Sequence, residues 1–102
     1  MKTPESYEKD EIKKYLVSIG AWYFCPFMAG FGKAGVADII ACIDGRFWSI
    51  EVKRPGKQPT VLQARRLTEV RKAGGHSAWG TGRKVIGEIE KWRRDRGFLG
   101  TQ

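Results

Sequence analysis

The stretch Gly35–Gly56, GVADIIACIDGRFWSIEVKRPG, decides the fold of this chain. Its two apolar runs, Val36–Ile43 and Arg46–Arg54, are rich in residues that favour β-strands, and Asp44-Gly45 separates them. Asp-Gly between two such runs is typical of a two-residue hairpin turn, because both turn positions need positive φ angles. The stretch therefore predicts two antiparallel strands joined by a tight turn.

The predicted turn also fixes which residues face one another across the hairpin. With a two-residue turn, Ile43 pairs with Arg46. Counting outward from that pair places Asp38 opposite Glu51, as a non-hydrogen-bonded pair with Cα atoms about 4.5 Å apart. Two carboxylates side by side destabilise a sheet unless a cation lies between them. The spacing therefore predicts a divalent-cation site, since Mg²⁺ takes one or two carboxylates and completes its shell with water and phosphate oxygens.

Lys53 adds an ammonium group to the same face. It lies two residues after Glu51, and alternate residues of a strand share a face. Such a site can hydrolyse a phosphodiester, because the metal polarises the phosphate while the lysine positions the attacking water. A solvent-facing strand with an ordinary Glu–Lys ion pair is the alternative interpretation, and Asp38 opposite Glu51 favours the catalytic one.

Outside the hairpin, helical and strand patterns alternate in a definite order. The sequence predicts a helix that starts at Thr3-Pro4 and ends at Gly20, a strand over Ala21–Met28, a helix over Thr60–Ala73, a strand over His76–Gly80 and a last helix after the capping residue Thr81. The order αβββαβ plus a C-terminal helix predicts an α/β fold with a mixed sheet flanked by helices. We expect residues 1–97 to form a single domain and residues 98–102 a flexible tail.

The composition narrows the function classes. The 102 residues carry 19 Lys and Arg against 11 Asp and Glu, a net charge of +8. So strong a surplus on a small domain favours a polyanionic partner such as nucleic acid. Two cysteines and a single histidine, His76, disfavour zinc folds, histidine–metal nucleases and Ser-His-Asp triads.

The uncharged segment Tyr15–Gly32 approaches the length of a membrane span. Glycines and Pro26 interrupt it, so we interpret it as the end of a helix followed by a strand. The N-terminus lacks the apolar core of a signal peptide. We therefore expect a cytoplasmic protein with no membrane partner and no small-molecule substrate.

The hairpin residues resemble a known nuclease signature. Gly35-Val36-Ala37-Asp38 followed by Glu51-Val52-Lys53 is similar to the PD-(D/E)XK pattern. The Gly-x-x-Asp, the Gly-Arg of the hairpin, Glu-Val-Lys-Arg-Pro-Gly and a following helical Gln resemble more particularly the VRR-NUC branch, the virus-type replication-repair nucleases. The resemblance runs from the first helix to about Trp79. Ala37 departs from the pattern, which usually has Pro there, at a position that shapes the backbone rather than touching metal.

The resemblance implies a restriction-endonuclease-like core and a Mg²⁺- or Mn²⁺-dependent DNA endonuclease, phage-encoded or bacterial. It implies that the carboxylates of Asp38 and Glu51 and the main-chain carbonyl of Val52 bind the metal, while Lys53 positions the water. It also implies a branched DNA substrate, such as a Holliday junction in DNA repair, and a homodimer. A non-catalytic basic nucleic-acid-binding protein is the alternative function.

The resemblance further implies an acidic residue on the first helix that helps to build the metal site. Three glutamates are candidates, Glu5, Glu8 and Glu11. Glu8 extends the apolar stripe through Ile12 back by one helical turn and so points towards the sheet. We therefore predict that Glu8 is this catalytic and metal-binding residue. The alternative is a solvated charge near the helix N-terminus.

Gln63 has two interpretations that do not exclude each other. Thr60-x-x-Gln63 is a capping box, in which the glutamine reaches back to the Thr60 amide. Gln63 also lies one turn before the inward-facing Leu67, and the family places a glutamine there beside the active site.

Two further surfaces follow from the sequence. Cations flanking the carboxylates are predicted to contact DNA phosphates: Lys33, Arg54, Lys57, Arg65 and Arg66. Aromatics crowded around the first strand offer a dimer interface, unless they complete the core: Trp22, Tyr23, Phe24, Phe27 and Phe31.

Overall fold

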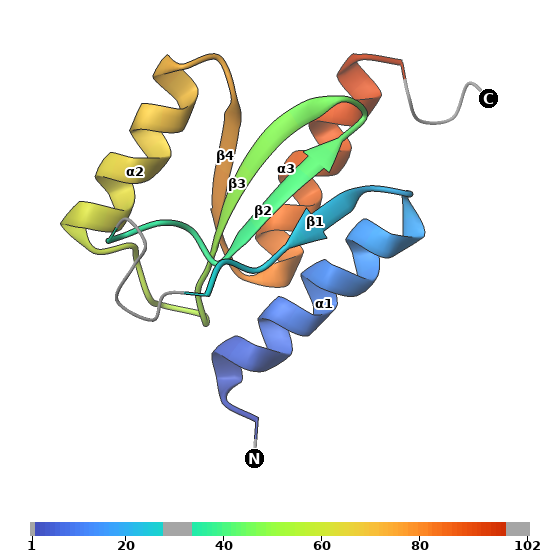
Figure 1. The fold of residues 1–102 in the computed structure, drawn as a ribbon. Helices are drawn as coiled ribbons and strands as arrows, with labels where there is room; N and C mark the ends of the chain where they lie inside the picture. The colour runs from blue at the N-terminus through green and yellow to red at the C-terminus, as the bar shows by residue number, and fades with distance from the viewer. Residues whose placement is uncertain (1, 28–33, 98–102) are drawn as a thin grey trace.

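The chain folds into a four-stranded mixed sheet with helices on both faces (Figure 1). The computed structural model describes residues 2–27 and 34–97. Its elements are α1 (Pro4–Ser18), β1 (Trp22–Phe24), β2 (Ile39–Ile43), β3 (Arg46–Val52), α2 (Val61–Lys72), β4 (His76–Gly80) and α3 (Gly82–Asp95). The strands lie in the order β1-β2-β3-β4, and every pair is antiparallel except β3–β4. The predicted α/β class and element order are confirmed.

The β2–β3 hairpin has the predicted turn and register. Asp44 and Gly45 have φ angles of 51° and 81°, as a two-residue turn of this kind requires. At the far end of the hairpin, Ile39 pairs with Ile50. Arg93 of α3 holds the turn, because its Nε donates to Asp44 Oδ2 over 2.7 Å. The hairpin is thus fixed at its turn as well as along its strands.

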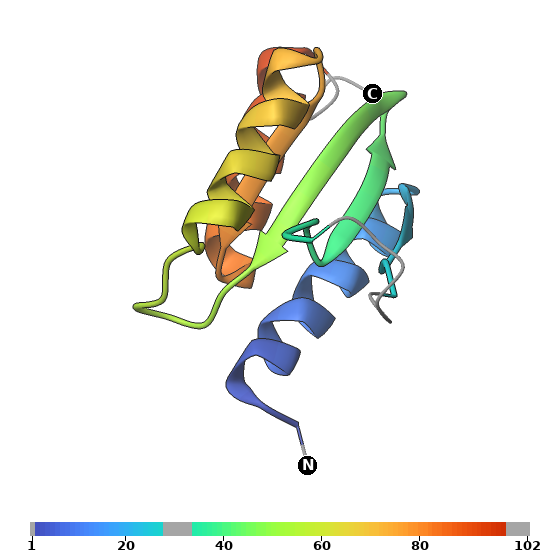
Figure 2. The same cartoon turned by 60° about the vertical axis from the view of Figure 1, so that its left-hand side comes forward.

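Alternation along the strands gives the sheet two different faces. One face packs against α1 and α3 and forms the main core, made of Ile12, Leu16, Ile39, Ala41, Ile43, Trp48, Ile50, Val52, Ala78, Val85 and Ile89. On the opposite face α2 packs against β3 and β4 (Figure 2). There Leu67 is buried, and its carbonyl accepts a hydrogen bond from Ser77 Oγ. Over β1 and β2 the same face leaves Trp22, Phe24 and Cys42 exposed.

Three strands are shorter than the sequence predicts, and β3 ends at Val52 instead of Arg54. β1 covers Trp22–Phe24 instead of Ala21–Met28. Pro26 has no N–H to donate to a strand ladder, so regular pairing stops before it. β2 begins at Ile39 instead of Val36. Met28 and the predicted flexible tail, 98–102, lie outside the described residues.

A threonine caps the N-terminus of each helix, as the sequence predicts for Thr3, Thr60 and Thr81. Their side-chain oxygens accept hydrogen bonds from the main-chain N–H three residues on, which satisfies one free donor of each helix. Within residues 2–27 and 34–97, no helix is both long enough and apolar enough to cross a membrane.

Candidate active site

Asp38 and Glu51 lie together at the end of the hairpin away from the turn. Asp38 directly precedes the last pair of the ladder, Ile39–Ile50, and Glu51 directly follows it. The two carboxyls interact through charge repulsion and a hydrogen bond, so they lie side by side. The N–H of Val52 donates to Asp38 Oδ2 over 2.9 Å. Asp38 is half-buried, whereas Glu51 is only 2% exposed. The structure therefore brings the two carboxylates to one face of the sheet, as the predicted register requires.

Two side chains contact one oxygen of Glu51 and leave the other without a partner. Gln63 Nε2 donates to Glu51 Oε2 over 3.0 Å, and Lys53 Nζ lies 3.6 Å from the same oxygen. Glu51 Oε1 is buried, and when Glu51 is ionised no donor in the described part of the chain hydrogen-bonds to it, whereas a protonated Glu51 can share a hydrogen bond with Asp38. An ionised carboxylate in this position is costly unless a cation completes its coordination.

The surroundings of Glu51 disfavour its charge. Burial raises the pKa of Glu51 from its ordinary value of 4.5 to about 8, and repulsion from Asp38 together with a hydrogen bond to it adds to the rise. Lys53 acts in the opposite direction, and the charge of Glu5 raises the pKa slightly further. A carboxyl with this pKa holds a proton at neutral pH, and a metal cation binding there would take the place of the proton.

The donor atoms at this site fit a hard divalent cation. The carboxylate oxygens of Asp38 and Glu51 are the ligand type that Mg²⁺ prefers. The buried Glu51 Oε1 supplies an oxygen with no competing partner in the described residues. Residues 2–27 and 34–97 contain no cluster of three or more His, Cys, Asp or Glu that would hold a metal by itself. A cation here would therefore complete its shell with water or phosphate oxygens.

Gln63 makes both of the contacts that the sequence leaves open. Its Oε1 accepts from the N–H of Thr60 over 2.9 Å, which completes the capping box of α2. Its Nε2 donates to Glu51. Because an amide side chain has one acceptor and one donor end, the cap orients the amide so that the donor meets the carboxylate.

The apolar stripe of α1 predicts that Glu8 points towards the sheet and helps to build the metal site, but the structure places its side chain against α3. Glu8 points inward, but it meets α3 and not the sheet, since its Oε1 accepts from the N–H of Gly82 over 2.8 Å. Glu11 also packs against Gly82. The positive end of the α3 dipole favours a carboxylate there. Among the acids of α1, Glu5 is the one whose charge raises the pKa of Glu51. The sequence favoured Glu8 over Glu5 as the metal ligand, because Glu5 lies near the helix cap.

The cations predicted to contact phosphate differ in their exposure and in the contacts that they make within the protein. Arg54 and Lys57 are exposed on the loop that follows β3, and Arg65 is exposed on α2. Arg66 is half-buried and engaged within the fold, because its Nε donates to the Ala34 carbonyl over 2.9 Å and its Nη1 pairs with a neighbouring carboxylate of α2. Lys33 lies outside the described residues.

A comparison with solved structures finds a chain described as a VRR_NUC domain. The match has a TM-score of 0.75 and 24% sequence identity, and it covers 87% of this chain and 97% of that chain. Comparisons with protein-family models and with curated proteins find no match. At this identity the likeness establishes the fold, so the resemblance seen in the hairpin motif extends to the arrangement of helices and strands.

The raised pKa of Glu51 predicts how stability depends on pH in the absence of metal. Between pH 4.5 and about 8 the folded chain holds a proton on Glu51 that the unfolded chain releases, so stability falls as the pH rises through this window and then levels off. Glu51→Gln should remove this fall and melt at a higher temperature than the wild type at pH 8.5. Thermal melts in EDTA from pH 5 to 9 measure how the melting temperature changes with pH. Glu88→Gln, at an exposed position, is the matched control. Parallel pH profiles for the wild type and Glu51→Gln would contradict the prediction.

The different surroundings of Glu8 and Glu5 predict different mutant phenotypes. Glu8→Ala should lower the free energy of unfolding by about 1–2 kcal/mol, because it leaves the first turn of α3 without its carboxylate. Glu5→Ala should leave the metal-free melting temperature almost unchanged and weaken the stabilisation by Mn²⁺. Thermal melts with and without Mn²⁺ compare the two variants. A metal response lost only in Glu8→Ala would assign the α1 metal ligand to Glu8.

Proposed function

We propose that this chain is a divalent-metal-dependent DNA endonuclease that hydrolyses phosphodiester bonds. The observation that carries the proposal is the buried carboxylate of Glu51 beside Asp38, with one oxygen unpartnered in the described chain and Lys53 Nζ 3.6 Å from the other. An ordinary surface ion pair needs neither the burial nor the second carboxylate. The net charge of +8 supports a polyanionic substrate.

Asp38, Glu51 and the main-chain carbonyl of Val52 would hold Mg²⁺ or Mn²⁺. When bound, the cation supplies polarisation of the scissile phosphate and a water of lowered pKa. Gln63 keeps Glu51 Oε2 engaged, so that Oε1 is directed to the metal position. The N–H of Val52 holds Asp38 in the same way through Oδ2. Each carboxylate therefore has one oxygen fixed by the protein.

Lys53 acts on the attacking water and on the phosphate. Its side chain is only 12% exposed and lies beside Glu51, so its ammonium group has a restricted position. From there it donates a hydrogen bond that orients the water and stabilises the charge that develops on the phosphate oxygens. Glu8, which accepts from the N–H of Gly82, would support the site through the α1–α3 contact, and the charge of Glu5 acts on Glu51.

A non-catalytic basic nucleic-acid-binding protein remains the second candidate, and the exposed cations Arg54, Lys57 and Arg65 favour it as much as they favour a nuclease. Metal dependence distinguishes the two functions. A nuclease cuts DNA with Mg²⁺ or Mn²⁺ and stops when EDTA is added, while a binding protein retains DNA under both conditions and cuts it under neither.

Lys53 provides the sharpest test of the proposed chemistry. Lys53→Ala should lower the cleavage rate at saturating DNA at least about 100-fold. Its affinity for DNA in EDTA should change less than about threefold, because it is one of 19 Lys and Arg residues. Lys53→Arg, which keeps the charge but alters the position of the donors, should bind like the wild type and cleave poorly. Equal losses of binding and cleavage would show that Lys53 is only a phosphate contact.

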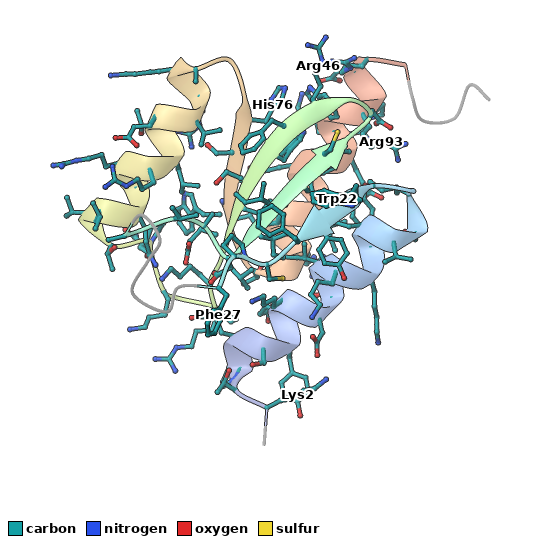
Figure 3. All side chains as sticks on the ribbon, in the orientation of Figure 1. Lys2, Trp22, Phe27, Arg46, His76 and Arg93 are labelled. Carbon is teal, nitrogen blue, oxygen red and sulfur yellow. The ribbon has the colours of Figure 1, made fainter. Side chains whose placement is uncertain are left out.

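We further propose that the substrate is branched DNA, such as a four-way junction, cut by a symmetric homodimer. One site of this kind cuts one strand, and symmetric resolution needs two sites of opposed orientation. Exposed aromatics supply an apolar surface for the second copy, with exposed fractions of 64% for Trp22, 46% for Phe24 and 88% for Phe27. Figure 3 shows Arg46 and Arg93 at one end of the sheet and Phe27 at the other. Phe27 therefore lies at the end where β3 terminates.

The aromatic surface differs in part from the one that the sequence predicts. Tyr23 packs against the core, and Phe31 lies outside the described residues. Phe47 of β3, 49% exposed, adds to the surface instead. It lines an apolar hollow of about 450 Å³ between the sheet and α2, together with Ile40 and Val70. Apolar surface of this kind is what subunits of a dimer commonly bury.

Light scattering at micromolar concentration tests the dimer, which should have twice the 11.5 kDa of one chain. Trp22→Ser combined with Phe24→Ser should yield monomers and convert paired junction cuts into independent nicks. Val61→Ser, at an 81% exposed apolar position on α2, is the matched control and should leave both properties unchanged. A wild-type mass of one chain would reject the dimer without rejecting the nuclease.

A further inference from the structure

A small hollow lined by cations lies next to Lys53, and the chemistry proposed above makes no use of it. It measures about 220 Å³, and its lining includes Arg54, Lys57, Trp79, Thr81 and Lys84. No carboxylate lines it. The N–H of Lys53 donates to the carbonyl of Gly80, another lining residue, over 2.8 Å. The hollow is therefore built directly onto the strand end that carries the catalytic lysine.

Lys84 is held in this hollow by contacts along its whole length. Its Nζ donates to the Trp79 carbonyl over 2.6 Å and lies 4.1 Å from the centroid of the Trp79 ring. Its stem crosses Gly80, where a Cβ atom would come within 2.8 Å of Lys84 Cδ. An ion pair with Glu88 over 3.0 Å adds a third contact, yet the side chain remains 46% exposed. A cation ordered before binding loses less entropy when an anion arrives.

The hollow lies beside the end of β3, because Gly80 in its lining accepts the hydrogen bond from the N–H of Lys53. Arg54 and Lys57 also line a neighbouring hollow of about 340 Å³ that contains Glu5. Glu5, whose charge acts on Glu51, is part of the lining of this second hollow. Arg54 and Lys57, on the loop that follows β3, are thus common to both hollows.

The charges around the hollow suit a phosphate group. In the described parts of the chain, neither Arg54 nor Lys57 forms an ion pair, so both are available to an anion. Thr81, the N-cap of α3, also lines the hollow, while the N–H of Gly82 in the first turn of α3 already donates to Glu8. Three cations from separate positions therefore line one space, and Glu88, which is not part of the lining, pairs with one of them, Lys84, over 3.0 Å.

We propose that the hollow between Arg54, Lys57 and Lys84 binds a backbone phosphate of the cleaved strand adjacent to the scissile one, and that Trp79 holds Lys84 in position for this contact. The proposal rests on the nuclease function proposed above. It makes Lys84 a positioning residue that fixes the strand over the site without touching the reacting atoms.

The test measures DNA binding in EDTA over a range of salt concentrations, so that cleavage is not required. Lys84→Ala should weaken binding about three- to tenfold and reduce the slope of log K against log salt by about one. Lys91→Ala is the matched control, because Lys91 lies on the same helix and forms the same i,i+4 ion pair, with Asp95. It removes the same charge and should leave the slope unchanged. Lys84→Arg should keep the wild-type slope.

Turnover measurements separate this role from a structural one. With Mg²⁺, Lys84→Ala should raise KM and leave kcat within about twofold, whereas a structural defect lowers kcat and the melting temperature together. If Lys84→Ala melts below the assay temperature, Lys57→Ala tests the same hollow from its exposed loop. Equal salt slopes for Lys84→Ala and Lys91→Ala, in a protein that cleaves DNA, would overturn the phosphate subsite and leave the nuclease standing. A reduced slope in a chain that never cleaves would support the subsite and reject the nuclease.

Discussion

The φ angles of Asp44 and Gly45, 51° and 81°, commit the β2–β3 hairpin to one register. Every feature of the carboxylate site depends on this register. A slip by one residue would turn Glu51 to the face covered by α1 and α3 and bury its carboxylate among aliphatic side chains. Arg93 reinforces the turn through an ion pair with Asp44 in which the two side chains are only 12% and 15% exposed. The turn is thus tied to α3 at the end of the sheet opposite the carboxylates.

The same fold that places Glu51 beside Asp38 makes the charge of Glu51 unfavourable. α2 follows the hairpin and packs back over β3, which removes the carboxylate from water and raises its pKa. Gln63 and Lys53 stabilise one oxygen but leave the other without a partner in the described residues. Stability given up at such a position is typical of functional sites. In the proposed nuclease, a bound metal would offset the free-energy cost of burying the Glu51 carboxylate.

Charge and apolar surface are separated on this small domain. Around the strand end that carries Lys53, the exposed cations include Arg54, Lys57 and Lys84. Over β1 and β2 the exposed side chains include Trp22 and Phe24, whose ring centroids lie 5.6 Å apart. This division allows a phosphate backbone and a second protein chain to occupy different regions. It gives the two proposals, a phosphate subsite and a dimer interface, separate surfaces to act through.

The sequence by itself determined the hairpin, its register, the helix caps and the pairing of Asp38 with Glu51, because each follows from residues close together in the chain or from strict strand alternation. The sequence also predicted both roles of Gln63, in the capping box and beside the carboxylates, because its amide side chain has one donor and one acceptor group. The sequence predicted too long a first strand, Ala21–Met28, because β1 stops at Phe24, before Pro26. Only the tertiary structure decided that Glu8 meets Gly82, 74 positions away, that α2 buries Glu51, and that Lys84 lies over Trp79. These contacts depend on how separate helices cross the sheet, and such packing angles follow from the whole core, so no local pattern of residues contains them.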